Sequence, residues 1–374
     1  MKNIIWYINE YGNKTFEEEK INELDILIFS QLIYNDFSSV FYNKNQIIFK
    51  DLVYELINNN KKGLSIAKDN ALDILKNMNN KKRYENIIFQ NYLYSKSDIH
   101  QFGAITIKIN NMLYINFEGT DNTISGWKEN FEFSYNYPTK SQELAGKYIN
   151  DILEESDCSC IIIGHSKGGN LAITGAMNTK PSLRDRIKNI YSFDGPGLLL
   201  EQFNSMWYYE IKDKIIDIIP NQSIIGVLLY HDNLTVIKSI ENGIMQHSIL
   251  SWIVDEKQLK RTKRSKLSVE FENTFNRWLV SLSYNDRKRF CDSIFKILKN
   301  KNIETFKELK RGNLKTLLSI IQKSINLSQA DKNFILKILK SFIENTNLLI
   351  INNSKEIIDS KKEQLIEFIN KREY

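Results

Sequence analysis

The sequence has few of the residues that build extracellular scaffolds or metal centres. It holds 3 cysteines, 4 prolines and 4 histidines among 374 residues. Cys158, Cys160 and Cys291 are odd in number and form no Cys-x-x-Cys pair, which argues against both a disulfide framework and a zinc site. The histidines are too scattered for a His-x-x-x-His or Glu-x-x-His motif, so we expect no metal.

Long apolar runs are also missing. No uninterrupted run approaches the length of a transmembrane helix, and Glu10 interrupts the first residues too early for a signal peptide. We therefore expect a soluble, reduced, cytoplasmic protein. The composition, 42% hydrophobic and 26% charged, is that of a globular chain rather than a disordered or fibrous one.

Charge is distributed unevenly along the chain. Residues 256–374 carry 26 Lys and Arg against 14 Asp and Glu, whereas the residues before them carry 25 against 31. This basic segment favours contact with an acidic membrane, an acidic partner or the acidic part of the same chain. A small helical domain with solvated lysines is the simpler interpretation. We expect no nucleic acid partner, because few aromatic residues are interleaved with the basic ones.

Alternating strand and helix patterns organise the first two thirds of the chain. Apolar segments at 103–109 and 112–117 surround Asn110-Asn111 and predict a hairpin. Three further strands are predicted at 161–163, 190–193 and 214–219, and helices are predicted at 22–34, 65–76 and 139–153. Residues 84–93 form an element of undecided type. The alternation predicts an α/β fold with a mostly parallel sheet flanked by helices.

The later residues have a different character. Beyond a basic connector at 257–266 there is no proline and a single glycine, and apolar residues recur with a helical period. Helices are predicted at 270–281, 286–299, 304–324, 330–345 and 355–370, with Ser328 capping the fourth. We therefore predict two domains: an α/β domain over residues 1–255 and a basic, all-helical domain over residues 256–374.

The strongest motif is Gly164-His165-Ser166-Lys167-Gly168, which follows the apolar run at 161–163. It predicts a strand, a sharp turn bearing the serine, and a helix. Glycines two positions on either side of Ser166 remove Cβ atoms that would clash with the neighbouring strand and helix. The turn also places the N–H of Lys167 at a helix N-terminus, where it can donate to a developing oxyanion. An ordinary glycine-rich turn is the simpler alternative.

A nucleophilic serine needs a base, and in sheet-based hydrolases the histidine follows the serine and the acid. Only His231 and His247 follow Ser166. We prefer His247, because late loops usually supply the base, whereas His231 could equally be a hydrogen-bonded histidine at a strand end. His165 and His100 are expected to be structural.

Three carboxylates compete as the orienting acid. Asp194 is preferred, because it directly follows a buried strand and therefore lies at the level of the serine. The Gly-Pro-Gly turn after it also fits a structural Asx-type turn. Asp232 is the main competitor, and Asp217 lies within a predicted strand. A second oxyanion donor is expected from the loop at Gly119-Thr120, for which a plain β-turn is the alternative.

These segments together resemble a known family. Phe117-Glu-Gly-Thr-Asp, Gly164-His-Ser-Lys-Gly-Gly-Asn-Leu-Ala and Phe193-Asp-Gly-Pro-Gly resemble the fungal-type, class three lipases of the α/β-hydrolase superfamily. More closely, they are similar to a related bacterial group, the Mbeg-like hydrolases. The resemblance spans residues 20–254. It implies an ester or lipid-ester hydrolase with Ser166 as nucleophile, His247 as base, and Thr120 and Lys167 as the oxyanion hole.

The chain departs from the lipase pattern at several positions. Glu118 stands where those lipases commonly have arginine, and Lys167 stands where they commonly have leucine. They usually place the acid near Asn221-Gln222, where this chain has amides, and this departure favours Asp194, a position that some other lipases use.

The sequence thus predicts hydrolysis of carboxylic esters, lipid or phospholipid acyl esters in particular, by Ser166, His247 and Asp194 through an acyl-enzyme. The mechanism requires no metal or organic cofactor. A peripheral contact between the basic helices and an acidic membrane is a further expectation. The alternative is a weak or inactive hydrolase-fold protein whose basic helices bind a partner or membrane.

Overall fold

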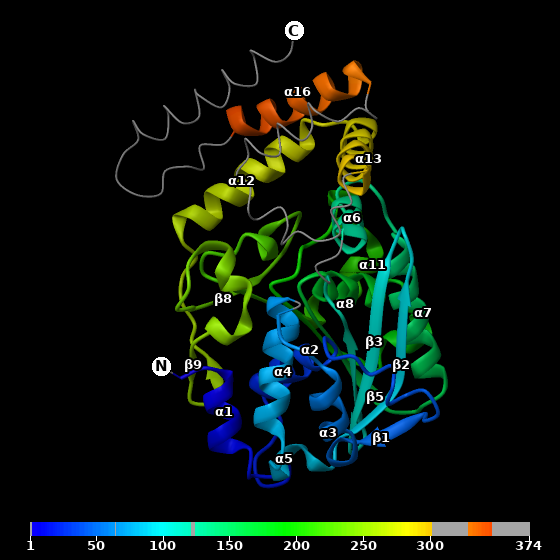
Figure 1. Cartoon of the computed structure of the whole chain (residues 1–374), viewed down its shortest axis with the longest axis vertical. Helices are drawn as coiled ribbons and strands as arrows, with labels where there is room; N and C mark the ends of the chain where they lie inside the picture. The colour runs from blue at the N-terminus through cyan, green and yellow to red at the C-terminus, as the bar shows by residue number, and fades with distance from the viewer. Residues whose placement is uncertain (1, 64, 121–123, 301–327, 346–374) are drawn as a thin grey trace. The chain divides into compact units, whose positions relative to one another are not determined.

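The computed structural model describes residues 2–63, 65–120, 124–300 and 328–345 (Figure 1). Packing divides the chain into two compact units, Met1–Asp121 with Pro138–Arg264, and Asn122–Tyr137 with Ser265–Tyr374. The domain boundary predicted from the sequence, between residues 255 and 256, stays a prediction. Packing joins residues 122–137, which the sequence analysis left in the α/β domain, to the later helices.

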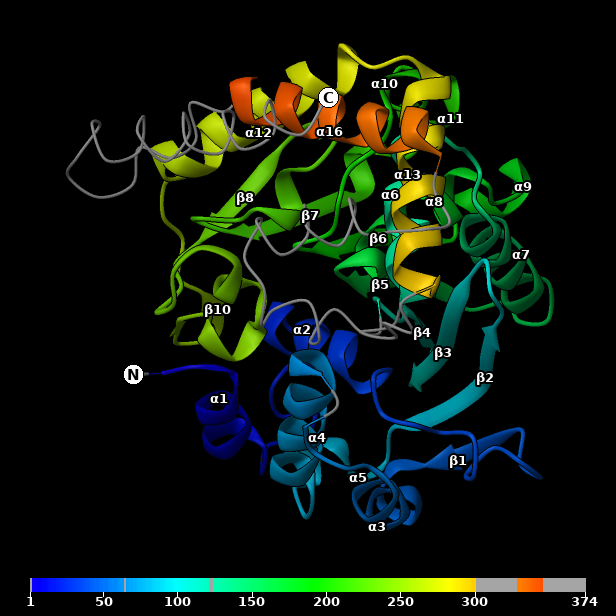
Figure 2. The same cartoon turned by 45° about the horizontal axis from the view of Figure 1, so that its top comes forward.

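A sheet of eight strands forms the centre of the first unit, as far as the described residues show, and Figure 2 shows its strands side by side in chain order. The strands are β1 (Gln46–Ile48), β2 (Ile88–Lys96), β3 (Gln101–Ile109), β4 (Met112–Phe117), β5 (Ser159–His165), β6 (Ile187–Phe193), β7 (Ile215–Pro220) and β8 (Leu234–Ile237). Strands β1 to β4 pair antiparallel and β4 to β8 pair parallel. The predicted α/β class is confirmed, as is the hairpin, in which Ile109 pairs with Met112.

Helices cover both faces of this sheet. Side chains alternate along a strand, so neighbouring residues of β4 contact different layers. Tyr114 packs its ring 5.4 Å from Phe29 of α2 (Glu23–Leu32), whereas Phe117 packs 6.0 Å from Tyr148 of α7 (Lys140–Glu154). Because the parallel strands are covered on both sides, they are rich in β-branched and aromatic residues rather than strictly alternating.

Other helices of the first unit surround this core. They are α1 (Ile4–Tyr11), α3 (Phe49–Asn59), α4 (Ile66–Met78), α5 (Lys82–Glu85), α8 (Lys167–Met177), α9 (Pro181–Arg184), α10 (Leu200–Phe203) and α11 (Met206–Tyr209), and a small two-stranded sheet pairs β9 (Val254–Asp255) with β10 (Gln258–Leu259). The helices predicted at 22–34, 65–76 and 139–153 are α2, α4 and α7. The undecided segment at 84–93 is divided between the end of α5 and most of β2.

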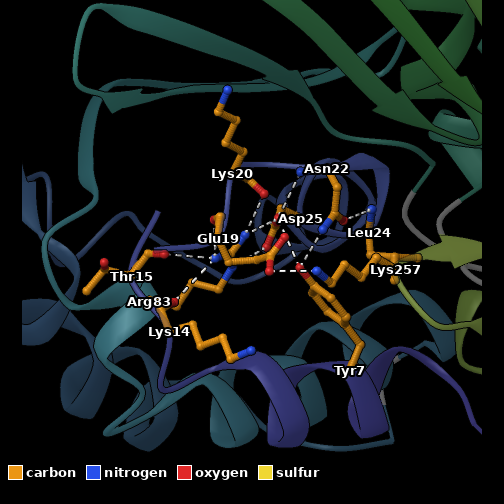
Figure 3. Close-up of polar contacts among 10 residues, drawn as sticks. All are labelled: Tyr7, Lys14, Thr15, Glu19, Lys20, Asn22, Leu24, Asp25, Arg83 and Lys257. Carbon is orange, nitrogen blue, oxygen red and sulfur yellow. Dashed lines mark hydrogen bonds and ion pairs between the residues drawn. The ribbon is translucent and has the colours of Figure 1, made fainter. Parts of the chain in front are cut away.

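A buried ion pair fixes the start of α2 (Figure 3). Arg83 donates to both carboxylate oxygens of Asp25, at 2.8 and 2.6 Å, and both side chains are fully buried. The remaining guanidinium hydrogens are satisfied by the main-chain carbonyls of Lys14, Thr15, Glu19 and Lys20. Burial and the Asp25 charge raise the pKa of Tyr7, which therefore stays a protonated donor to Asp25. Bidentate geometry of this kind compensates the cost of burying the charges.

The described helices of the second unit are α6 (Ile124–Glu132), α12 (Lys266–Val280), α13 (Tyr284–Asn300) and α16 (Gln329–Asn345). The sequence did not predict α6, whose Phe131 ring lies 5.5 Å from that of Phe295 on α13. The predicted cap of α16 is confirmed, because Ser328 accepts from the N–H of Asp331 at 3.1 Å. The helices predicted at 304–324 and 355–370 lie outside the described residues. Among the helices that are described, none is long and apolar enough to cross a membrane.

Candidate active site

Ser166 is the single residue between His165, which ends β5, and Lys167, which begins α8. Its φ of 59° and ψ of −131° fall in a region that residues other than glycine avoid. A Cβ on Gly164 would overlap the main chain of Gly168, and a Cβ on Gly168 would overlap the carbonyl of Phe117 on β4. A strained serine between a strand and a helix, with close backbone approach on both sides, has the geometry of a nucleophile elbow.

The Gly119 loop lies against this turn. A Cβ on Gly119 would stand 2.7 Å from the carbonyl oxygen of His165 and 3.1 Å from Cβ of Ser166. Thr120 follows Gly119 directly and is partly exposed, while Lys167 is the first residue of α8. The two segments that carry the predicted oxyanion donors therefore meet at Ser166. The donor roles of Thr120 and Lys167 stay predictions.

His247 and Asp194 form a close pair. Nδ1 of His247 lies 2.6 Å from Oδ2 of Asp194, which is buried immediately after β6. The other oxygen of Asp194 accepts from Ser223 Oγ at 2.5 Å and from the N–H of Gly226 at 3.2 Å. His247 ends the short 3-10 helix η3 (Gly243–His247), and 27% of its side chain is exposed. A carboxylate bonded at Nδ1 leaves Nε2 as the nitrogen that can take up a proton.

The contact between the serine and this pair is indirect. The ring of His247 packs at a tilt of 31° against the ring of His165, the residue before Ser166, with centroids 4.6 Å apart. Between Ser166 and His247, both of which are described, no side-chain hydrogen bond is formed. Catalytic hydrogen bonds are often long before substrate binds, so a Ser166–His247 contact stays a prediction.

The competing histidine is engaged elsewhere. Nδ1 of His231 lies 2.6 Å from Oδ2 of Asp217, and its Nε2 lies 3.1 Å from the carbonyl oxygen of Leu228. Only 2% of the side chain is exposed. Asp232 is exposed beside this pair. Of the three candidate carboxylates, Asp194 is therefore the one that the fold brings to His247, and His231 is a hydrogen-bonded histidine.

The remaining histidines are His100 and His165. The two ring nitrogens of His100 lie 2.9 and 2.8 Å from the hydroxyls of Ser95 and Ser97, between β2 and β3. His165 is buried beside the site. Burial, with a smaller effect of His247, lowers the pKa of His165 well below its usual value, so its ring is neutral.

Tyr34 is a site residue that the sequence did not indicate. Its buried hydroxyl lies 3.1 Å from Nδ1 of His165 and 3.2 Å from the carbonyl oxygen of His165, and a Cβ on Gly119 would overlap it. Nε2 of the neutral His165 ring lies 3.0 Å from the carbonyl oxygen of His247, to which it can donate. Tyr34 and His165 thus connect the oxyanion loop, the serine turn and the His247 loop. No sequence motif marks Tyr34, because the residues that its hydroxyl contacts are distant in the sequence.

The site holds a hydroxyl on Ser166, an imidazole on His247 and a buried carboxylate on Asp194, which are the kinds of group that nucleophilic catalysis by a serine uses. Within the described residues, no group of three or more His, Cys, Asp or Glu side chains is arranged to hold a metal ion.

A sheet with parallel central strands and a strained serine turn between a strand and a helix defines an α/β protein with a nucleophile-elbow turn. A family model described as Mbeg1-like matches residues 78–296, more than half of the chain, and the chain belongs to this family. The resemblance to the Mbeg-like group is thereby confirmed. Among solved structures, the crystal structure of M37 lipase is similar, at 16% identity and a TM-score of 0.35 over 55% of this chain and 70% of that one. No curated protein matches the sequence.

Proposed function

We propose that this protein is a serine hydrolase that cleaves carboxylic esters through an acyl-enzyme, with lipid or phospholipid acyl esters as its substrates. One contact supports this function most strongly, the 2.6 Å approach of His247 Nδ1 to the buried carboxylate of Asp194. His247 lies on the loop that packs against His165, the residue before Ser166. Membership of the Mbeg1-like family, whose motifs in this chain resemble those of the class three lipases, supports the same reaction class.

The reaction begins when Nε2 of His247 accepts the hydroxyl proton of Ser166 and the serine oxygen attacks the ester carbonyl. Asp194 holds the imidazole in the required tautomer and stabilises the imidazolium. The N–H groups of Lys167 and Thr120 stabilise the tetrahedral oxyanion, each contributing about 3 kcal/mol in the transition state. His247 then protonates the leaving alcohol, and water, activated by the same histidine, releases the acid from Ser166.

Apolar side chains beside His247 support an apolar acyl substrate. Ile244 and Met245 precede His247 on η3 and are 47% and 44% exposed, and Ile240 is 50% exposed on the same loop. An acyl chain bound there would cover apolar surface that water now contacts, which is favourable by about 25 cal/mol per Å². Single exposed apolar residues are common on proteins, but these three lie on the loop of the proposed base, where we propose that they contact the acyl chain.

Hydrolysis of p-nitrophenyl esters of increasing acyl length tests the reaction and its substrate class. We expect wild type to hydrolyse these esters, His247→Gln to lose nearly all activity, and His231→Gln to retain it. Replacing Ile244 and Met245 by serine should lower activity on long acyl chains more than on short ones. If folded wild type hydrolyses no ester of the series, the protein is instead a hydrolase-fold binding protein.

The basic helices are proposed to dock on an acidic membrane. The residues after 255 carry a net excess of basic side chains, which anionic lipids attract. Sedimentation with vesicles of phosphatidylglycerol should remove the full-length protein from solution at low ionic strength and release it at high ionic strength. Equal binding to vesicles of phosphatidylcholine alone would contradict this electrostatic docking.

A further inference from the structure

The side chain of Lys167 is buried and bonded to the start of β3. Its Nζ donates to the main-chain carbonyl of Gln101 and to Oε1 of the Gln101 side chain, the latter at 3.1 Å. Both residues are completely buried. A buried ammonium group is costly unless oxygens surround it, so these bonds fix where the side chain of Lys167 lies. Since Lys167 follows Ser166, they also anchor the nucleophile turn.

The same glutamine side chain reaches the oxyanion loop. Its Nε2 donates to Oε2 of Glu118 at 2.7 Å, and Glu118 is 4% exposed at the end of β4. The N–H of Glu118 donates to the carbonyl of Gly103 at 2.9 Å, and its carboxylate packs where a Cβ on Gly103 would stand. Glu118 directly precedes Gly119-Thr120. One buried amide therefore joins the nucleophile turn to the loop that faces it.

We propose that Gln101 is a positioning residue, which sets the separation of the two oxyanion donors through Lys167 and Glu118. This inference rests on the proposed ester hydrolysis. The donor on α8 is the N–H of Lys167 itself, and the donor on the loop is the N–H of Thr120, two residues after Glu118. Both must point at one oxygen at about 3 Å, so small shifts of either segment weaken oxyanion stabilisation.

The network explains two positions at which this chain departs from the lipase pattern. Glu118 and Lys167 carry opposite charges and are joined by buried hydrogen bonds through the side chain of Gln101. In this proposal Gln101 acts through the segments that it joins and takes no part in the chemical step.

The test compares Gln101→Met with a matched control, Gln31→Met. Gln31 is also a completely buried glutamine, and its amide donates to Ser30 within α2. We expect Gln101→Met to lower kcat for p-nitrophenyl butyrate about tenfold to a hundredfold with little change in KM. Phenylboronic acid, whose serine adduct places an oxygen in the oxyanion hole, should inhibit this variant more weakly in proportion to the loss of kcat/KM. Gln31→Met should keep the kcat of wild type and its inhibition by phenylboronic acid.

A second pair keeps the inference testable if Gln101→Met does not fold. Glu118→Gln retains an oxygen that can accept from Gln101, whereas Glu118→Leu does not, so kcat should be largely retained in the first and lost in the second. An unchanged kcat in Gln101→Met or Glu118→Leu, or a rise in KM alone, would overturn the positioning role while leaving the proposed function intact. If wild type neither hydrolyses the ester nor binds the boronic acid, the proposed function fails, and the positioning role fails with it.

Discussion

The hydroxyl of Tyr34 lies 3.1 Å from Nδ1 of His165, the residue that precedes the serine of the nucleophile turn. Tyr34 follows α2, whose first turn is held by the buried pair of Asp25 and Arg83. His165 in turn contacts the carbonyl of His247. A helix from the N-terminal part of the chain is therefore connected through two side chains to the loop that carries the proposed base.

Tyr34→Phe should lower kcat, because it removes the hydroxyl that bonds His165, the residue before Ser166. A net hydrogen bond contributes about 1 kcal/mol, which corresponds to about fivefold in rate if the loss falls on the transition state. Tyr148→Phe is a matched control, since its buried hydroxyl bonds Thr106 and the carbonyl of Asn91 instead. Steady-state kinetics would contradict the expectation if both variants lost the same activity.

Asp194→Asn should reduce kcat by about 10⁴-fold, because an amide favours the wrong tautomer of the base. Asp217→Asn should leave kcat nearly unchanged, since Asp217 bonds His231. Asp217→Asn should instead lose about 1–3 kcal/mol in its free energy of unfolding, because the buried hydrogen bond to His231 is weakened. Parallel measurements of kcat and of urea denaturation separate the two roles. The reverse pattern would make the pair of Asp217 and His231 the functional one.

The free energy of unfolding should decrease as pH falls below about 6.5, the usual pKa of an unfolded histidine. His165 has a lowered pKa in the folded protein, chiefly because it is buried. Below that pH the unfolded chain binds a proton that the folded chain does not, so acid favours unfolding until the lowered folded pKa is reached. Comparing wild type with His165→Gln by denaturation at several pH values isolates this contribution. An identical pH dependence in both proteins would contradict it.

Arg83→Met should destabilise the protein by about 3–5 kcal/mol, because it leaves the carboxylate of Asp25 buried without its partner. The double variant Arg83→Met with Asp25→Leu should lose less than the single variant, since no buried charge is then left uncompensated. Urea denaturation measures both values. A double variant less stable than Arg83→Met would contradict this expectation. It would show that Asp25 stabilises the protein through its other hydrogen bonds, which come from Tyr7 and the N–H of Asn22.

Much of the fold could be predicted because its signals are local. The hairpin at Asn110 and the strand and helix that flank Ser166 each depend on residues within about ten positions. The helix α6 could not be predicted in this way, because Phe131 finds its apolar partner Phe295 far along the chain. Its own stretch is short and follows a polar loop.

In the candidate site, too, residues with local sequence signals could be predicted and residues with distant partners could not. Ser166 is marked by its neighbours. His247 was favoured over His231 because late loops usually supply the base, and Asp194 was favoured over Asp232 and Asp217 because it directly follows a buried strand. The contacts of Tyr34 and Gln101 carry no such signal. Tyr34 meets His165 across 131 positions and Gln101 meets Lys167 across 66, and only the assembled sheet brings these residues together.

The most direct test of the central claim is labelling with a fluorophosphonate probe, followed by peptide mapping. The account predicts one label per chain of folded wild type, located on Ser166, and no label on Ser166→Ala. Labelling should slow strongly in His247→Gln and continue in His231→Gln. Labelling that persists in Ser166→Ala, or folded wild type that takes up no label, would contradict the account.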